Sequence, residues 1–473
     1  MKKETKIFKI IMFFLIFFYY AALHLAAMKN NFEIVNLLLQ YKNKIESQLF
    51  KGCHKIEQIE IPSSVTLIES HSFENCSSLL TIIIPSSVCS IGNSSFKGCS
   101  SLNRILIESS IRDINESTFS GCSSLTQITI PSSVTSIKKC AFKGCSSLQQ
   151  ISIPSSVVSI GDNSFFGCKS LVELTLPSSV AEISNFMFYG CSSLSSLTIP
   201  SSVTKIGNFA FCQCTSLREI AIPSSVTFLG QNVFSLCTSM MRVTIPSSVT
   251  TISDFAFSGC SSLTQVILPS SVTSIGTRAF SGCNSLVQIS IPSSVNSIGE
   301  SAFNGCSSLE QIEIPSSLKS IQKFCFKNCS SLSQIKIPSS VYLILESAFE
   351  CCSSLAQIDL PSSLKVIAKG LFKGCSSLYQ VEVPSSVKSI GHFAFQDCLS
   401  LEEIVIPPSV KLIGKHVFEG CESLYHIEIP SSVKSIGEGS FSGCWSLTEI
   451  SIPDGIDPDL IGIEPDVDVD IIQ

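Results

Sequence analysis

The chain has 473 residues, of which 44% are hydrophobic and only 14% charged, and its formal net charge is −6. This acidic balance provides no overall basic surface for nucleic acid or for anionic lipid. Because so few residues are charged, Ser, Thr, Asn and Gln must form most of the surface that faces water.

The first segment, residues 1–20, is hydrophobic after a basic start. An uncharged run over residues 10–28 follows four lysines, Lys2, Lys3, Lys6 and Lys9. A basic start followed by an apolar run of this length is typical of a signal peptide or a membrane anchor. We therefore expect residues 10–28 either to contact a membrane or to form a buried helix.

The second segment, residues 21–49, favours a buried helix. Residues 22–27 (Ala-Leu-His-Leu-Ala-Ala) and 33–39 (Glu-Ile-Val-Asn-Leu-Leu-Leu) resemble one ankyrin repeat. Asn30 stands where that family has the Gly of its inter-helix turn, and Asn tolerates the left-handed backbone almost as well. The resemblance implies a short helical cap on the following structure. A membrane span ending near Met28 would consume the first helix of this cap, so the two interpretations compete.

A 23-residue unit then repeats from about Phe50 to Pro453. It reads Cys-Ser-Ser-Leu-x-x-Ile-x-Ile-Pro-Ser-Ser-Val-x-x-Ile-Gly-x-x-Ala-Phe-x-Gly. Eighteen of the 23 cysteines lie on this lattice, from Cys53 to Cys444. Such a unit cannot close a core alone and buries its apolar side chains only by stacking. Residues 50–453 are therefore predicted to form a β-rich solenoid of about 18 coils.

Each part of the unit has an expected role. The alternation in Leu-x-x-Ile-x-Ile predicts a short strand with one buried face. Pro ends the strand because it has no N–H for a ladder, and only Glu108 replaces it. The Ser-Ser pair suits a turn in which hydroxyls bond nearby backbone N–H groups. The Gly after the later Ile would supply an unusual backbone angle, and the Ala-Phe segment is expected to form a helical or 3₁₀ turn.

The unit resembles the BspA-like leucine-rich repeat family, whose repeats combine the same Leu-x-x-Ile-x-Ile-Pro, Ser-Val-x-x-Ile-Gly and Ala-Phe-x-x-Cys segments. The resemblance covers about 400 residues in roughly 18 copies. It implies a leucine-rich-repeat solenoid with a parallel sheet on one face. It also implies protein–protein contacts and adhesion, often at cell surfaces.

The lattice cysteines are predicted to be small buried side chains rather than metal ligands or a disulfide ladder. Equivalent cysteines in neighbouring coils would lie close enough to bridge, but their side chains point in parallel. No His accompanies them, so the spacing of a zinc site is missing. We expect Cys351–Cys352 and Cys212-x-Cys214 to be the points most open to oxidation.

Catalysis finds no support in the sequence. The six histidines form no recurring group with Ser and Asp, and no P-loop, dinucleotide fingerprint or His-Glu-x-x-His is present. The Ser residues recur in every coil as turn formers, whereas an enzyme needs one nucleophile. The chain is therefore predicted not to be an enzyme and to bind no cofactor or metal.

Outward positions of the strands are the remaining candidates for a site. Glutamines recur at one such position in six successive coils and are expected to form a side-chain amide ladder: Gln265, Gln288, Gln311, Gln334, Gln357 and Gln380. Acidic residues gather on the same face of the C-terminal half and form the candidate protein-binding site: Glu310, Glu313, Asp359, Glu382, Glu402, Glu403, Glu428 and Glu449. Lysines occupy another face, one position after the core Val or Leu: Lys319, Lys365, Lys388, Lys411 and Lys434.

The last segment, residues 454–473, breaks the pattern. It contains seven acidic residues and no basic one. We expect a frayed acidic tail, since its Asp-x-Asp spacing does not match a calcium-binding loop.

The function expected from these features is that of a non-enzymatic scaffold or surface adhesin that binds an unidentified protein through an extended repeat face. A location at the cell surface or on a membrane is favoured. Two alternatives remain: a cytoplasmic adaptor, if residues 21–49 are a true ankyrin-like cap, and a repeat array with a mainly structural role at a surface.

Overall fold

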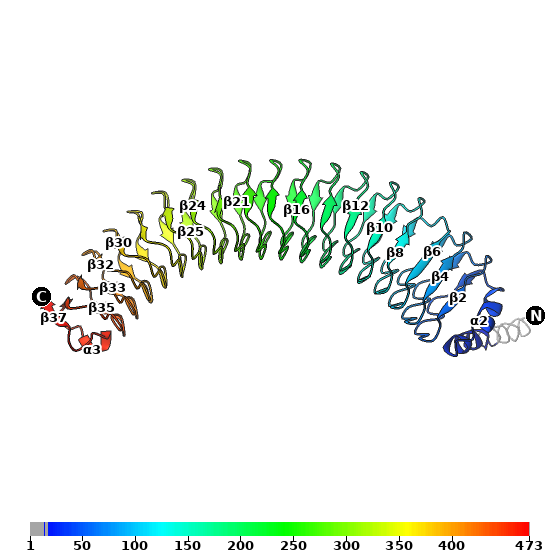
Figure 1. The fold of residues 1–473 in the computed structure, drawn as a ribbon, viewed down its shortest axis with the longest axis horizontal. Helices are drawn as coiled ribbons and strands as arrows, with labels where there is room; N and C mark the ends of the chain where they lie inside the picture. Colours follow the sequence, from blue (N-terminus) through cyan, green and yellow to red (C-terminus); the bar gives the residue numbers. More distant parts are fainter. Residues whose placement is uncertain (1–13, 15–17, 473) are drawn as a thin grey trace, which may run out of the picture. The chain divides into compact units, whose positions relative to one another are not determined.

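The fold is taken from a computed structural model that describes residue 14 and residues 18–472. The chain divides into two compact units, unit 1 (Met1–Ser225) and unit 2 (Val226–Gln473). Each unit is a stack of 23-residue coils, and each coil contributes two short parallel strands (Figure 1). This arrangement confirms the predicted parallel leucine-rich-repeat solenoid.

Unit 1 contains helix α2 (Phe32–Leu39), which is preceded by a helix over residues 18–28. The first strand of each coil is three or four residues long: β2 (Gln58–Glu60), β4 (Thr81–Ile84), β6 (Arg104–Ile107), β8 (Gln127–Thr129), β10 (Gln150–Ser152), β12 (Glu173–Thr175), β14 (Ser196–Thr198) and β16 (Glu219–Ala221). The second strand has two residues: β1 (Lys44–Ile45), β3 (Leu67–Ile68), β5 (Ser90–Ile91), β7 (Asp113–Ile114), β9 (Ser136–Ile137), β11 (Ser159–Ile160), β13 (Glu182–Ile183) and β15 (Lys205–Ile206).

Unit 2 repeats this plan and ends with α3 (Pro458–Ile461) and β37 (Asp468–Ile472). Its first strands are β18 (Arg242–Thr244), β20 (Gln265–Ile267), β22 (Gln288–Ile289), β24 (Gln311–Glu313), β26 (Gln334–Lys336), β28 (Gln357–Ile358), β30 (Gln380–Glu382), β32 (Glu403–Val405), β34 (His426–Glu428) and β36 (Glu449–Pro453). Its second strands are β17 (Phe228–Leu229), β19 (Thr251–Ile252), β21 (Ser274–Ile275), β23 (Ser297–Ile298), β25 (Ser320–Ile321), β27 (Leu343–Ile344), β29 (Val366–Ile367), β31 (Ser389–Ile390), β33 (Leu412–Ile413) and β35 (Ser435–Ile436).

Strands pair in register with the residues that stand 23 positions away. Ile151 of β10 faces Ile128 of β8, for example, so identical repeat positions form rows along the stack. The lattice Pro ends each ladder as predicted. The exception is the coil in which Glu108 replaces Pro. Glu108 has the N–H that Pro lacks and donates it to the Ile84 carbonyl at 2.9 Å. The pairing of β4 with β6 therefore reaches Ile84 and Ile107.

Phenylalanine forms the centre of the core in both units. Within each unit, the lattice Phe stacks almost parallel on the Phe of the next coil, with ring centroids between 5.1 Å for Phe50–Phe73 and 5.9 Å for Phe349–Phe372. These rings are fully buried in every coil from Phe50 to Phe303. Offset stacking adds to the free energy of burial, so the column couples each coil to its neighbours.

The lattice cysteines have a polar role as well as an apolar one. Most of these thiols lie next to the backbone carbonyl of the Phe in the preceding coil and donate to it, as Cys145 does to Phe119 at 3.1 Å. Sixteen such contacts recur along the two units, ending with Cys444 and Phe418. The same carbonyl also accepts the amide of the Cys in its own coil, as Phe119 does from Cys122 at 3.1 Å. Cys therefore fills the core and adds a second hydrogen bond to a buried carbonyl.

Exposure of the remaining cysteines differs from the sequence-based expectation. Cys212, Cys214 and Cys352 are buried, and Cys351 is only half-buried. Cys89 is the exposed cysteine. The expectation relied on two cysteines being close in sequence, whereas exposure depends on which face of the coil the position occupies.

The glycines after the later Ile serve a different purpose from the one predicted. At Gly92, Gly161 and Gly299, for instance, the backbone is not left-handed. A Cβ at Gly299 would instead lie 2.4 Å from the backbone nitrogen of Thr277 in the preceding coil. Glycine is needed there because two backbones approach closely.

The serine hydroxyls also act differently from the prediction. In most coils, the second Ser after the Pro donates to the carbonyl of the core Val, Ile or Leu in the preceding coil, as Ser156 does to Val134 at 2.7 Å. The hydroxyl thus joins two coils rather than closing its own turn. These bonds recur along both units and supplement the backbone ladders.

The Ala-Phe segment is a pair of tight turns, not a 3₁₀-helix. Two residues per coil are left-handed: the one two positions before the Phe, such as Ser117 (φ 56), and the one before the Cys, such as Gly121 (φ 75). This geometry turns alternate N–H groups toward the next coil. The Phe119 amide donates to Ala141 at 2.9 Å and the Gly121 amide to Lys143 at 2.6 Å.

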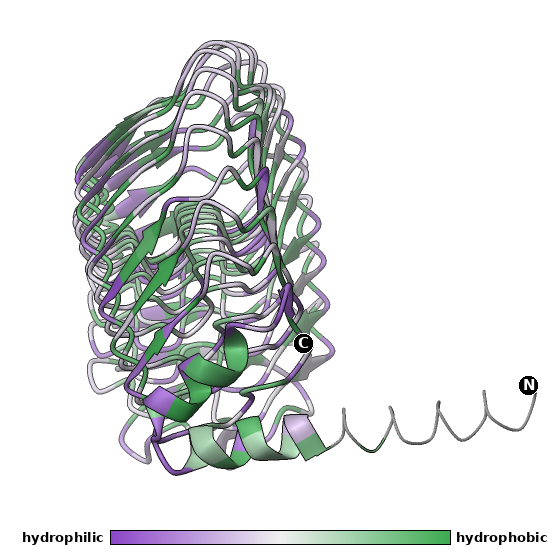
Figure 2. Cartoon of the chain, turned by 90° about the vertical axis from the view of Figure 1, so that its right-hand side faces the viewer, coloured by the Kyte–Doolittle hydropathy of each residue, from purple (hydrophilic) through white to green (hydrophobic). Residues whose placement is uncertain are grey.

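The N-terminal end of unit 1 is covered by the two helices (Figure 2). Their inner side chains are buried: Leu23, Ala26, Ala27, Val35 and Leu39. Asn30 joins them with φ 54, the left-handed turn expected at this position.

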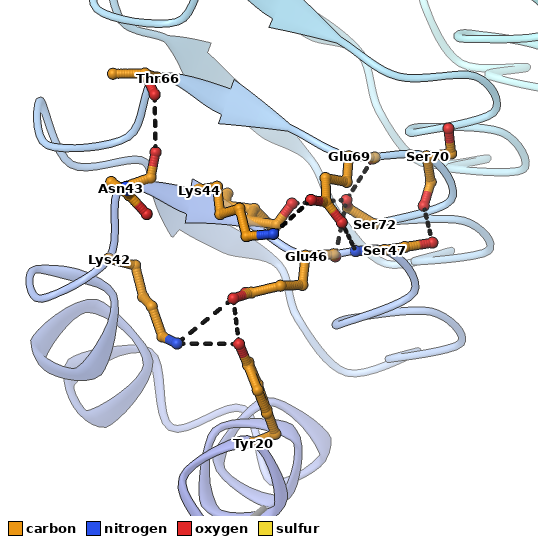
Figure 3. Close-up of polar contacts among 11 residues, drawn as sticks. Tyr20, Lys42, Asn43, Lys44, Glu46, Ser47, Thr66, Glu69, Ser70 and Ser72 are labelled. Carbon is orange, nitrogen blue, oxygen red and sulfur yellow. Dashed lines mark hydrogen bonds and ion pairs between the residues drawn. The ribbon is translucent and has the colours of Figure 1, made fainter. Parts of the chain in front are cut away.

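Polar contacts fix this cap to the first coils (Figure 3). The Tyr20 hydroxyl donates to Glu46, and Lys42 Nζ lies 3.0 Å from the same hydroxyl. Lys44 Nζ donates to Glu69 at 2.7 Å and thereby holds the pKa of the Glu69 carboxyl below its usual range. Residues 18–28 thus belong to a cap on the solenoid.

The membrane expectation for the start of the chain lies largely outside the described residues, because residues 1–13 and 15–17 are not described. In the rest of the chain, up to residue 472, no helix combines the length and the apolar character needed to span a bilayer.

The C-terminal segment is an incomplete further coil rather than a frayed tail. In α3, the carbonyls of Leu460 and Ile461 accept the amides of Gly439 and Phe441, as the next coil would. β37 then pairs with β36 over five residues, from Asp468 opposite Glu449 to Ile472 opposite Pro453. Its aspartates alternate with Val and Ile, which suits a strand that has one edge in water.

Removal of one ring from the Phe column should unfold part of unit 2 before the rest. Phe280 stacks on Phe257 and Phe303 at 5.4 and 5.5 Å, so Phe280→Ala should cost about 3–5 kcal/mol locally. The urea unfolding transition, monitored by circular dichroism, should then broaden, and its m-value should fall. The exposed Tyr342→Ala variant is the control. One cooperative transition with an unchanged m-value would contradict the prediction.

Alkaline pH should destabilise the chain through its buried thiols. Burial raises the pKa of Cys99, Cys145 and Cys191 from 9.0 to about 12. Their contribution to stability is complete below the ordinary thiol pKa and is lost as the pH rises toward the folded-state value. The urea midpoint should therefore fall steeply from about pH 9 to about pH 11. Cys145→Ala should reduce this slope, whereas Cys89→Ser, at an exposed thiol, should not.

Candidate binding surface

The acidic residues predicted from the sequence all lie in unit 2. Those within strands alternate with buried core residues, as in β30, where Gln380 and Glu382 are exposed and Val381 is buried. Side chains of paired residues in a parallel sheet point to the same face, about 4.8 Å apart. We name the eight predicted residues the acidic strip: Glu310, Glu313, Asp359, Glu382, Glu402, Glu403, Glu428 and Glu449.

A lysine divides this strip. Lys336 of β26 pairs with Glu313 on one side and bridges to Asp359 on the other. A positive residue therefore stands between two acidic ones in the same row, although it forms no ion pair within 4.0 Å with either of them. The part with uncompensated negative charge begins at Glu382 and continues toward the C-terminus.

The strongest acidic section covers β32, β34, β36 and β37. Glu403 faces His426, His426 faces Glu449, and Glu449 faces Asp468. A second row on the same face lies two residues further along each strand, and in it Glu428 is followed by Ser451 and then by Asp470. β37 thus adds two carboxylates that the sequence analysis had assigned to a frayed tail. The alternation of Asp with Val and Ile at residues 466–472 was the signal for this strand.

The carboxylates of the strip have no ionic partner within residues 18–472. Other glutamates of unit 2 do: Glu346 binds Lys369 at 2.9 Å, and Glu350 binds Lys327 at 3.0 Å. The Lys369 hydrogen bond holds the pKa of Glu346 below its usual range. The unit therefore forms these ion pairs on its turn side, whereas the carboxylates of the acidic strip are unpaired among the described residues.

Aromatic side chains accompany the acidic strip, and the sequence analysis missed them. Backbone hydrogen bonds place Tyr379, Glu402 and Tyr425 in one row, with Glu402 between the two rings. Both tyrosines are exposed, and Trp445, one coil further, is 70% exposed. Tyr and Trp are the side chains that most often carry the energy of protein interfaces. The two tyrosines recur in alternate coils at one outward position, which was the available signal, whereas Trp445 stands at another position of its coil.

The six glutamines predicted as an amide ladder share one row. Gln288 faces Gln311, and Gln311 faces Gln334. Among the described residues, hydrogen bonds between neighbouring amides of this row are not formed, while the Tyr379 hydroxyl lies 3.3 Å from Gln357 Oε1. The amide ladder therefore stays a prediction, although paired glutamines do lie opposite one another on neighbouring strands.

Unit 1 has a hollow of its own beside the helical cap. It measures about 560 Å³ and lies between α2 and the faces of β2 and β4, with Phe32, Glu60 and Ile83 along its wall. The Asn36 side chain of α2 accepts the Glu60 amide at 3.3 Å and holds the helix to the strand. Among the described residues, Glu60 is the one ionisable side chain along this wall, so the hollow provides no pair of groups for acid–base chemistry.

Histidine, cysteine and carboxylate groups do not converge on a metal site anywhere in the described part of the chain. His71 and His416 each contact a glutamate three residues later, at 3.0 and 3.1 Å, on the turn side. These pairs lack a neighbouring nucleophile and serve the turns in which they lie.

Comparison with known proteins places these features in context. The family model for the BspA type leucine rich repeat region (6 copies) matches residues 43–157, 135–263, 250–379 and 342–458. A search of curated proteins finds no match.

Two solved structures are similar to the chain over most of its length. A leucine-rich repeat protein from Bacteroides ovatus is 28% identical, with a TM-score of 0.54, and the match covers 88% of this chain and 91% of that one. A leucine rich cell surface protein from Faecalibacterium prausnitzii is 30% identical over 72% of this chain and 91% of that one, with a TM-score of 0.43.

Proposed function

Because the chain belongs to the family of BspA-type leucine-rich repeat proteins, we propose that it is a non-enzymatic scaffold that binds a basic protein through the acidic strip. Family membership confirms the resemblance seen in the repeat. The observation that carries the proposal is the acidic section of unit 2, with Glu403, Glu428 and Glu449 on adjacent strands and without ionic partners among the described residues.

Geometry supports a protein partner of extended shape. Equivalent residues on neighbouring coils are about 4.8 Å apart along the stack, so an extended partner contacts the same repeat position several times. Unpaired carboxylates raise the association rate of a basic partner and select against an acidic one. Tyr379, Tyr425 and Trp445 supply the large, rigid contact area in which binding energy concentrates.

We also propose a cell-surface location, in agreement with the adhesive role that the family resemblance implies. A tag on the C-terminus should be accessible to antibody on intact cells, and protease added outside should remove it. Access only after permeabilisation would contradict this location and would favour the cytoplasmic adaptor.

Charge reversal tests the binding surface directly. Glu402, Glu403 and Glu428 changed together to Lys should slow association with a basic, extended peptide selected on the wild-type chain by at least about tenfold, because steering would become repulsion. The triple change of Glu300, Glu346 and Glu438 to Lys alters net charge equally on the turn side and should have little effect. Equal slowing by both variants, or no slowing by the first, would contradict the proposal. Surface plasmon resonance measures both rates.

A further inference from the structure

The lysines of unit 2 that follow the core Val or Leu form a second charged row, on the side of the second strands. We name Lys319, Lys365, Lys388, Lys411 and Lys434 the lysine row; all five side chains are exposed. Backbone hydrogen bonds of 2.8, 2.9 and 2.9 Å join Lys388 to Lys365, Lys411 to Lys388, and Lys434 to Lys411. Four ammonium groups thus follow one another at the coil spacing of about 4.8 Å.

These lysines lack the ionic partners that other lysines of unit 2 have. On the turn side, Lys323 and Lys369 both contact Glu346, at 3.5 and 2.9 Å, and Lys415 contacts Glu438 at 3.0 Å. Alternating charge is therefore the pattern by which this chain stabilises a charged row. The lysine row has no glutamate at any of its positions and, within the described residues, no ion pair. Like charges in adjacent rungs repel, so the row is not explained by stability of the stack.

Apolar and hydroxyl groups flank the lysine row. Tyr342 occupies the same position in the coil between Lys319 and Lys365, with its amide 3.1 Å from the Lys319 carbonyl, and it is 58% exposed. The next position along each coil carries no carboxylate and includes exposed Val366 and Leu412. A ligand on this row would therefore meet ammonium groups in a line, beside one aromatic ring and short apolar patches.

From these observations we propose that the lysine row binds a linear acidic polysaccharide that lies along the stack. Each sugar of such a chain presents one carboxylate or sulfate. The distance between its acidic groups is therefore the length of one monosaccharide, which is comparable with the spacing between neighbouring coils. The apolar faces of sugar rings contact Val366 and Leu412, and one ring stacks on Tyr342. Ammonium groups on flexible stems adjust to either acidic group.

Charge density favours a glycan over a nucleic acid. Duplex DNA carries one charge per about 1.7 Å of axis, and a single strand one per about 3.4 Å. Lysines at about 4.8 Å would leave much of that charge unmatched. Single-stranded nucleic acid is also held by several stacked aromatic rings, whereas this row offers Tyr342 alone.

Binding of fluorescent polygalacturonate oligosaccharides to the full chain tests the proposal. Lys388→Gln with Lys411→Gln should weaken binding by roughly 10- to 100-fold, since two of the four consecutive charges are lost. The matched control, Lys369→Gln with Lys415→Gln, removes the same charge from paired positions and should change the affinity by less than about threefold. Tyr342→Ala should weaken binding without altering its salt dependence. Urea denaturation verifies that each variant is folded.

Parallel ligands decide among the alternatives. Dextran sulfate should also bind through the lysine row, which would show that the row accepts sulfate as well as carboxylate, whereas neutral dextran should not bind. The proposal would be overturned if the wild-type chain failed to bind both acidic glycans, or if the two lysine pairs affected binding equally. Binding of a DNA oligonucleotide as tight as that of the glycans, at equal salt, would overturn it too.

Discussion

Each coil packs against a near copy of itself, so every repeat position must be compatible with the same position in the coils before and after it. Phe rings stack on Phe rings, and sixteen lattice thiols donate to a Phe carbonyl 26 residues earlier, as Cys168 does to Phe142. Ser hydroxyls donate to the Val carbonyl of the preceding coil. Glycine is required where a Cβ would meet the neighbouring backbone, as at Gly299. The uniformity of the repeat follows from this requirement, because one misfit residue disturbs two interfaces.

Much of this architecture could be predicted from the sequence. Alternating Leu and Ile predicted the first strand, and Pro predicted its end. The longer pairing where Glu108 replaces Pro was seen only in the structure. Contacts between coils were not predictable from one coil read alone. The thiol–carbonyl bond, the Ser–Val bond and the close approach at glycine all join residues more than 20 positions apart. The left-handed residue before Ala-Phe was also hidden, because Ser117, Phe209 and Arg278 all occupy that position and share no side-chain property.

The first coil of unit 1 and the last coil of unit 2 each lack one neighbouring coil, and other elements cover them. Two helices cover the start of unit 1, where Asn36 and Tyr20 bond to the first coils. At the other end, the carbonyls of α3 accept the amides that a further coil would have bound, and β37 pairs with β36 in place of the next strand. The acidic composition of this segment suggested a frayed tail, and its period-two alternation was the better guide. The same strand brings Asp468 and Asp470 into line with the acidic strip.

Recognition is expected where a row departs from what stacking requires. The candidate acidic residues were predictable because they differ from coil to coil, and the structure brings Glu403, Glu428 and Glu449 onto adjacent strands. Tyr379 and Tyr425 escaped notice since Glu402 separates them in the repeat, although they share a row in space. Rows that alternate charge stabilise the stack, whereas rows that keep one sign repel internally and call for an external partner.

Amide hydrogen exchange resolved to single residues tests the central requirement most directly. If each coil is held by the coil beside it, protection should recur every 23 residues in the interior of both units. The amides of Phe142 and Phe280, which donate to the next coil at 2.9 Å, should be strongly protected. The amide of Ser155, which has no backbone acceptor within the described residues, should exchange rapidly. Protection without this period, or confined to a few coils, would contradict the account.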